Sequence, residues 1–354
     1  MYTQKVFLDE GLDYIYVKVH ETLMIEIAVL LGANEDRAKS EVKEVMEFME
    51  KLAKISLPMN VKDKDTFYNP TTLVEIPGAS SKNLPQSWTK YVQKLFNYGD
   101  EEIDIQDTER VIIEDKNFYE KLSSVLGNQK KKTLANYAAW KVAFQTRDYL
   151  KSEELQKEVQ KFDRAMMGTV QKSDKARLGT VYKEPRWKIC TLSVGFNPSG
   201  SLIPRFHHAV DSMYARLLVD ADQKVKAGEM ADYLQKATSK MIDDADWMDD
   251  DTKKEAKKKL KNMKKIISFP DEVLNKQKVD DFYKGIVMLD DDYFGNVMKI
   301  DKHNNRKSDL RLRDPNVLGD WNRIFAAMAQ AGYDPAGNLY QLAAGILQGE
   351  GEKH

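Results

Sequence analysis

The sequence has a single cysteine, Cys190, among 354 residues, so no disulfide can form within the chain. Proline and glycine are also scarce, at 10 and 18 residues, a composition that disfavours a disordered or all-β chain. The longest apolar run, at residues 27–33, is far too short to span a bilayer. No charged start, apolar stretch and small-residue cleavage site opens the chain, so we expect no secretory signal in it.

The sequence also has no excess of positive or of negative charge. Lysine and arginine number 55 and aspartate and glutamate 56, which leaves a formal net charge of −1. A protein that binds nucleic acid through its phosphates needs a basic surplus, so we expect no nucleic-acid partner.

Helical periodicity is what the sequence has in abundance. Apolar residues recur at steps of three and four in four long segments, each of which we expect to bury one face of a helix: residues 35–57, 153–167, 229–246 and 250–267. Shorter helical candidates lie near residues 12–31, 86–97, 115–126, 131–149 and 211–226. The sequence therefore predicts a mainly α fold.

Interruptions of this pattern are few. Residues 58–85 contain four prolines and read as a long connection, and residues 196–206 form a second break. After about residue 300 the composition shifts toward Asn, Asp, Arg and Gly. We expect a large multi-helix domain at residues 1–300 and an irregular C-terminal tail at residues 301–354.

An aspartate cluster at residues 243–251 precedes a lysine-rich stretch at residues 253–265. Acids at a helix start and cations further along suit the helix dipole, and Asp249 is a natural N-cap. The spacing lacks the alternating ligands and central glycine of a calcium loop, and no aromatic residues interrupt the lysines to stack bases. We interpret the segment as a solvated helix face.

Residues for catalysis are few. Zinc peptidases place two histidines four residues apart on a helix, with a glutamate between them. His20-Glu21 could begin such a motif, but Met24 occupies the position of the second histidine. Neighbouring His207 and His208 point about 100° apart on a regular helix, so they favour an exposed loop pair over a metal site. Neither a Gly-x-Ser-x-Gly elbow nor a glycine-rich phosphate loop is present.

Several segments together resemble one family. Trp247-Met248-Asp249, followed by Thr252 and by residues 266–270 (Ile-Ile-Ser-Phe-Pro), is similar to the "Trp-Met-Asp-x-x-Thr … Ile-Gly-Tyr-Pro" segment of the neprilysin and endothelin-converting-enzyme family of zinc metalloendopeptidases. Residues 185–190 (Pro-Arg-Trp-Lys-Ile-Cys) resemble its "Pro-Arg-Trp-x-x-Cys", and residues 344–348 (Ala-Gly-Ile-Leu-Gln) its "Phe-Pro-Ala-Gly-Ile-Leu-Gln". The resemblance covers residues 10–348.

The resemblance implies the helical cap lobe of the family, without the lobe that carries His-Glu-x-x-His and a third glutamate ligand. We therefore expect no cofactor here, since zinc belongs to complete family members. Lys132 and Lys183 stand near positions where relatives have cysteines, so Cys190 has lost its partner. The family implies an extracellular location, while the missing cysteines and sequons also fit the cytosol.

The resemblance also suggests three sets of site residues. Gln330-Ala331 occupies the place of the family's substrate-holding "Asn-Ala". Residues 196–208 look longer than the family's segment, which makes Arg205, His207 and His208 candidates for an acquired loop site, with a mobile solvated loop as the alternative. An apolar face left by the missing lobe is expected around three residues: Trp321, Ile324 and Phe325.

These expectations combine into one functional hypothesis and two alternatives. We expect a catalytically inactive, truncated neprilysin-like protein with a binding, scaffold or regulatory role, because without zinc ligands no water is activated. Its partner would be a protein, a peptide or a second copy bound through the vacated face. The first alternative is a part of a zinc endopeptidase whose catalytic lobe is on a separate or removed segment. The second is a structural or storage protein.

Overall fold

The computed structural model describes residues 15–57, 67–79, 81, 84, 86–99, 102–149, 152–167, 205–315, 317, 321, 325–335 and 337–348. The chain divides into two compact units, unit 1 at residues 1–182 and unit 2 at residues 183–354. Three parts of the sequence named above lie outside the described residues: residues 168–204, which include Cys190; Ile324; and residues 58–66, 80, 82, 83 and 85 of the connection.

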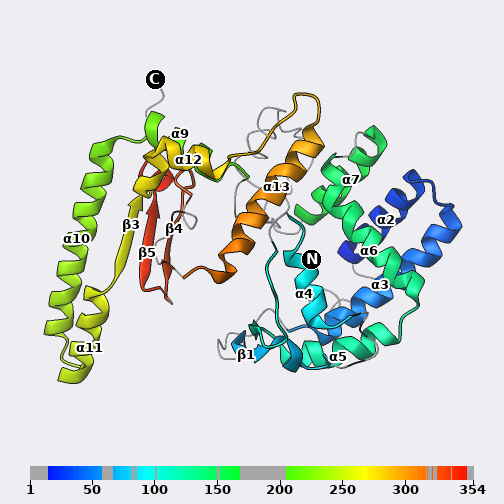
Figure 1. Ribbon diagram of the computed structural model, residues 1–354, viewed down its shortest axis with the longest axis horizontal. Helices are drawn as coiled ribbons and strands as arrows, with labels where there is room; N and C mark the ends of the chain where they lie inside the picture. The colour runs from blue at the N-terminus through cyan, green and yellow to red at the C-terminus, as the bar shows by residue number, and fades with distance from the viewer. Residues whose placement is uncertain are drawn as a thin grey trace. The chain divides into compact units, whose positions relative to one another are not determined.

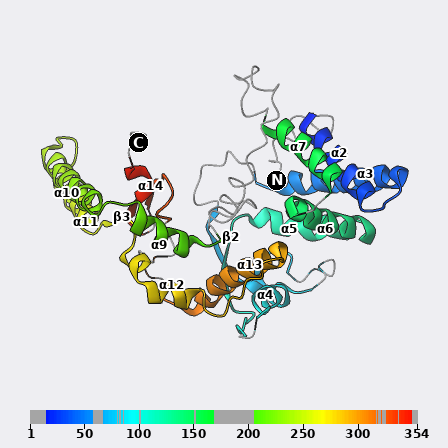
Figure 2. The same cartoon turned by 90° about the horizontal axis from the view of Figure 1, so that it is seen from above.

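Unit 1 is a group of helices with one short two-stranded antiparallel ribbon (Figures 1 and 2). Its helices are α2 (Ile15–Leu30), α3 (Glu35–Ile55), α4 (Trp88–Phe96), α5 (Lys116–Gly127), α6 (Lys131–Thr146) and α7 (Glu153–Met167). The strands β1 (Asn69–Thr72) and β2 (Arg110–Ile113) pair antiparallel. Short 3₁₀ turns lie at Leu73–Glu75 and Arg147–Tyr149.

The core of unit 1 forms where α2 packs against α3 and α7, and where α3 packs against α6. Helix α3 begins at Glu35 because the Asn34 side chain accepts a hydrogen bond from the Arg37 backbone N–H. The buried helix face predicted for residues 35–57 is confirmed, since Ala38, Val42 and Val45, at steps of four and three, are buried. Helix α7, in the predicted segment at residues 153–167, likewise buries three apolar residues at steps of four and three: Leu155, Val159 and Phe162.

His20 lies inside this core and not on its surface. Its ring is within 5.1–5.6 Å, centroid to centroid, of three aromatic rings: Trp140, Phe144 and Phe162. Burial lowers the pKa of His20 from 6.5 to about 3, and nearby cations add to the shift. His20 is therefore neutral in the folded protein at physiological pH.

Glu41 of α3 connects that helix to α6. It accepts hydrogen bonds from Asn136 Nδ2 and from Arg37 Nε, both at 2.6 Å, and forms an ion pair with Lys132. Hydrogen bonds from Lys132 and Arg37 lower the pKa of Glu41 to about 2. One turn further along α3, Glu44 contacts Lys130 and Thr133 of the segment that begins α6.

Unit 2 combines helices with one small sheet. Its helices are α9 (His207–Leu217), α10 (Ala221–Asp244), α11 (Asp250–Lys261), α12 (Lys276–Phe282), α13 (Tyr293–Leu310) and α14 (Ala344–Leu347). Its strands are β3 (Lys264–Ser268), β4 (Ala331–Asp334) and β5 (Leu339–Ala343). Two 3₁₀ turns occur at Asp271–Leu274 and Arg311–Arg313. Helices α10 and α11 lie side by side in both views (Figures 1 and 2).

The sheet of unit 2 has the order β3-β5-β4. Strand β3 runs parallel to β5, with Lys264 opposite Leu339 and Ser268 opposite Ala343, whereas β4 runs antiparallel to β5. Ser268 is buried with φ +70°, a left-handed conformation that favours glycine. The resembled family motif has glycine at this position.

Three helix predictions in unit 2 need correction. The segment at residues 250–267 is helical only to Lys261, because Ile266-Ile267 pair with β5 as a strand. The candidate at residues 211–226 is two helices, since Asp220 N-caps α10 after a break. The apolar face predicted for residues 229–246, now in α10, is exposed: Met230 and Leu234 have exposed fractions of 65% and 63%. This face therefore does not cover a core.

The mainly α fold is confirmed, with small sheets in both units. Asp249 caps α11 as predicted, accepting from Thr252 N at 2.7 Å. The tail expected to be irregular after residue 300 contains β4, β5 and α14, and α13 continues across residue 300. The two-domain boundary at that residue stays a prediction. Among the described residues, no helix is long and apolar enough to cross a membrane.

Acidification should loosen the core of unit 1 through His20. Below pH 6.5 the unfolded chain binds a proton that the folded chain takes up only near pH 3, so stability falls as pH drops through this window. Between pH 7 and pH 5 the loss is about 2 kcal/mol. Hydrogen exchange of the α2 and α6 amides, measured by mass spectrometry, reports it.

A His20→Leu variant serves as the control, because leucine has no proton to bind. Its α2 and α6 amides should lack this component of the pH dependence. An identical pH dependence of protection in the variant and the parent chain would contradict the assignment.

Candidate functional site

The two predicted histidines lie at the start of α9, in the interior of unit 2. His207 and His208 are 4% and 0% exposed. The ring of His208 stacks on Trp321 at 3.6 Å between centroids, and Phe282 of α12 meets both histidine rings edge-on. The prediction that the two histidines lie exposed on a loop is therefore wrong, because aromatic rings from α12 and from Trp321 enclose their side chains.

Arg205 precedes α9 and is buried as well. Its guanidinium forms a two-pronged ion pair with Asp301 of α13, at 2.8 Å from Nε to Oδ1 and 3.1 Å from Nη2 to Oδ2. Asn304 of the same helix donates to the Arg205 carbonyl at 2.8 Å. Matched in this way, Arg205 holds the start of α9 against α13. A binding role for Arg205, His207 and His208 stays a prediction.

Asp211, one turn into α9, is an acidic group that the sequence pattern does not single out. It is 2% exposed, and its Oδ1 accepts the backbone N–H of Ala327 at 3.2 Å. Among the described residues, Oδ2 has no hydrogen-bond partner. Burial raises the pKa of Asp211 from 3.8 to about 6, against the opposing effect of the backbone hydrogen bonds.

Tyr283 lies beside these groups and accepts the His208 backbone N–H at 3.2 Å through its hydroxyl oxygen. Burial raises the pKa of the Tyr283 hydroxyl. His208, Asp211 and Tyr283 thus bring titratable groups together, but with the surrounding apolar residues they form a core and not an accessible centre.

The exposed apolar face predicted around Trp321 is not seen, because Trp321 and Phe325 pack against other side chains. Trp321 is 8% exposed, because it stacks on His208 and belongs to the core of unit 2. Phe325 is half-buried and meets His207 edge-on at 5.7 Å. Trp321 is thus not available on an exposed face, and partner binding at this place stays a prediction.

Gln330 and Ala331 are exposed at the beginning of β4. Among the described strands, β4 pairs only with β5, so it is an edge strand. The Ala343 N–H donates to the Gln330 carbonyl at 2.9 Å, and bonded pairs alternate along an antiparallel ladder. The N–H and C=O groups of Ala331 and Tyr333 therefore face the open edge.

A groove of about 820 Å³ lies between α10 and the sheet, next to β4. Its walls are mostly apolar, and Lys226 is the one charged side chain among the described residues that line it. At one end, Gln348 Nε2 donates to Gln223 Oε1 at 3.2 Å, which links α14 to α10. The lining comes from α10 (Met230, Leu234), α11 (Leu260), β3 (Ile267), β4 (Ala331, Gly332), β5 (Tyr340, Leu342) and α14 (Leu347).

The sequence pattern does not reveal this groove. Met230 and Leu234 have the spacing of a buried helix face, and only the position of α10 over the sheet shows that the space below them is open. The useful signal in the sequence was the resemblance that picked out Gln330-Ala331.

The described residues do not provide a metal centre. They contain no group of three or more His, Cys, Asp or Glu side chains placed to hold an ion. The residues described here thus do not fit the zinc that the resemblance associates with complete family members.

Comparison with known proteins gives consistent matches. The sequence profile described as "Peptidase family M13" matches residues 5–270. The chain is 30% identical over 350 residues to Neprilysin-2 of Drosophila melanogaster, covering 97% of this chain and 43% of the relative. It is 26% identical over 327 residues to endothelin-converting enzyme 1 of Bos taurus, covering 92% and 40%. The chain therefore spans about two fifths of the length of these relatives.

Solved structures agree on the fold. A zinc metalloprotease of Mycobacterium tuberculosis in its open state matches with a TM-score of 0.75 at 18% identity, over 99% of this chain and 49% of that one. PepO of Lactobacillus rhamnosis matches with a TM-score of 0.70 at 16% identity, over 94% and 47%.

Replacing Asp211 with asparagine should stabilise unit 2 at neutral pH. The folded Asp211 carboxyl holds its proton to about pH 6, whereas the unfolded one releases it near 3.8, so stability falls as pH rises through this window. Above pH 6 the cost is up to about 3 kcal/mol. Asparagine keeps the acceptor for Ala327 without the charge, so the α9 amides of Asp211→Asn should exchange more slowly at pH 7.5.

The difference between the variant and the parent chain should disappear by pH 4, where both side chains are neutral. A stability difference that is the same at both pH values would show that the buried charge is not its cause.

Proposed function

Because the chain belongs to peptidase family M13, we propose that it binds extended peptides along the open edge of β4, without cutting them. The observation that carries this proposal is the row of backbone groups at Ala331 and Tyr333, which have no strand partner among the described residues. An extended peptide can add to such an edge as a further strand, with main-chain hydrogen bonds supplying affinity.

The adjoining groove supports the proposal. Alternate side chains of an added strand point to the same face of the sheet. Gly332 and Ala331 of β4 belong to the groove lining, so the side chains on one face of the peptide would enter a mostly apolar space. Exposed Gln330 would present its amide at the position where the family resemblance places a substrate-holding asparagine.

Lack of cleavage is part of the same proposal. The 354 residues contain no His-Glu-x-x-His, and the described ones offer no cluster of metal ligands. The nearest sequence, His20-Glu21, lies in the core of unit 1, where His20 is surrounded by aromatic rings. The residues of this chain would then bind and orient a peptide, outside the cell as the family resemblance implies.

A second candidate function has its own support. The chain covers 43% of Neprilysin-2 and 40% of endothelin-converting enzyme 1, so it corresponds to one part of each of those proteins. In that case the same residues serve an active zinc peptidase whose metal ligands lie on another segment or another chain. The exposed groove under α10 would then be a surface for that segment or for a second copy.

An Ala331→Pro variant tests peptide binding at β4. Proline removes the N–H that faces the open edge and leaves the pairing with β5 in place, as edge positions tolerate. Affinity for a fluorescein-labelled Gly-Phe-Leu-Ala-Gly peptide, measured by anisotropy, should fall about tenfold. Ala331→Val keeps the N–H, so its loss of affinity should be clearly smaller than that of the proline variant. Equal affinity of the proline variant would place binding elsewhere.

A peptidase assay separates the two candidates. The pure chain, supplied with one equivalent of Zn²⁺, should leave the same peptide uncut, because it lacks the ligands that activate water. Chelator-sensitive cleavage by the pure chain would overturn the first proposal. A native species well above 40.7 kDa on a denaturing gel would favour the second.

A further inference from the structure

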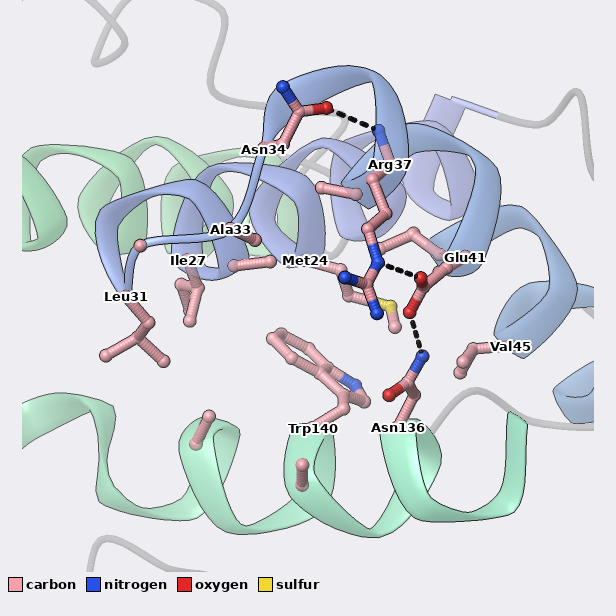
Figure 3. A pocket seen from close by; sticks show the side chains of 16 residues that line it. Met24, Ile27, Leu31, Ala33, Asn34, Arg37, Glu41, Val45, Asn136 and Trp140 are labelled. Carbon is pink, nitrogen blue, oxygen red and sulfur yellow. Dashed lines mark hydrogen bonds and ion pairs between the residues drawn. The ribbon is translucent and has the colours of Figure 1, made fainter. Parts of the chain in front are cut away.

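A second cavity lies within unit 1, far along the chain from the residues of β4. It measures about 350 Å³ and is bounded by α2, the turn after it, α3 and α6 (Figure 3). Cavities of this size bind small molecules, usually through apolar walls and a few polar groups.

One side of the cavity is apolar. Trp140 presents its ring to the cavity opposite Met24 and Ile27 of α2 and Leu31 of the turn that follows (Figure 3). Trp140, Met24 and Ile27 are themselves buried in the unit 1 core, so these walls are held in place. Such a surface fits an aromatic or branched aliphatic group.

The other side carries an arginine fixed in position. Arg37 Nε donates to Glu41 Oε1 at 2.6 Å, and Asn136 Nδ2 donates to Glu41 Oε2 at 2.6 Å. Among the described residues, the two terminal nitrogens of Arg37 make no hydrogen bond. Figure 3 shows the Arg37 guanidinium between Glu41 and the Trp140 ring, where it extends into the cavity.

The charge around this side favours an anion. Arg37 and Glu41 are the charged side chains of the described lining. Lys132 forms a second ion pair with Glu41 from outside the lining, so one carboxylate is shared between two cations. Lys132 and Arg37 hold the pKa of Glu41 at about 2, so it stays ionised and keeps Arg37 oriented at neutral pH. Because Glu41 is shared with Lys132, the Arg37 guanidinium can also contact a negative charge on a ligand.

We propose that this cavity binds a monocarboxylate with an apolar body. The carboxylate accepts hydrogen bonds from the terminal nitrogens of Arg37, and the apolar body packs against Trp140 and the α2 side chains. An amine would instead face the Arg37 guanidinium. The carboxylate can belong to a free acid or to the C-terminus of a peptide that ends in an apolar residue, since Arg37 is 67% exposed and the cavity is open there.

Calorimetric titration of the full chain with 4-phenylbutanoate tests the proposal. The acid should bind, and its amide, 4-phenylbutanamide, should bind at least tenfold more weakly because it lacks the charge. N-acetylglycylphenylalanine, titrated in the same way, represents a peptide C-terminus. Tighter binding of this dipeptide than of the free acid identifies a peptide as the source, and the reverse order identifies a free acid.

Two pairs of variants locate the binding. Arg37→Gln should weaken 4-phenylbutanoate binding at least tenfold, whereas Lys39→Gln should not change it. Lys39 lies on the same helix, in an equivalent pair with Glu35 at 2.6 Å, but outside the cavity. Ala139→Leu should fill the cavity and abolish binding, whereas Ala138→Leu, the same change at the next exposed position of α6, should preserve it.

Circular dichroism melting curves confirm that each variant is folded. Equal binding of the acid and the amide would overturn the proposal, as would equal losses in the two charge variants. Binding that survives Ala139→Leu would place the ligand at another site, and no heat of binding at millimolar acid would exclude the cavity as a carboxylate site.

Discussion

The parallel pairing of β3 with β5 is the constraint on which the geometry of unit 2 depends. It joins residues 264–268 to residues 339–343, and parallel strands can meet only through a long crossover, which here contains α12 and α13. Once β5 is fixed, the short turn after β4 places that strand at the edge, and α10 is left over one face of the sheet. The open edge and the apolar groove are both results of this one pairing.

Unit 1 is organised by polar contacts at the rim of an apolar core. Glu41 accepts from two elements of structure at once, its own helix and α6, and both oxygens are engaged. The same contacts that join the helices also fix Arg37 over the Trp140 cavity. A structural ion pair and a feature suited to ligand binding are therefore parts of one arrangement.

Helix periodicity predicted much of this fold because α3 and α7 bury the residues that their spacing selects. It failed where the burial of a stripe depends on partners distant in sequence. The stripe of α10 has the same spacing but faces a groove, and residues 266–267 follow a helical pattern but pair with β5. His207 and His208 were predicted to be exposed because Phe282 and Trp321, which enclose them, lie more than 70 residues away in the sequence. Gln330-Ala331 was singled out only by resemblance to a family motif, and its place on an edge strand comes from the pairing of β4 with β5.

Lys132 has a consequence for how unit 1 responds to its surroundings. The family resemblance places a cysteine of the relatives near this position, whereas here the side chain forms an ion pair with Glu41, whose side chain is 18% exposed. A contact of this kind weakens with ionic strength and is indifferent to thiols. The charged part of the contact between α6 and α3 thus responds to the salt of the medium and not to its redox potential.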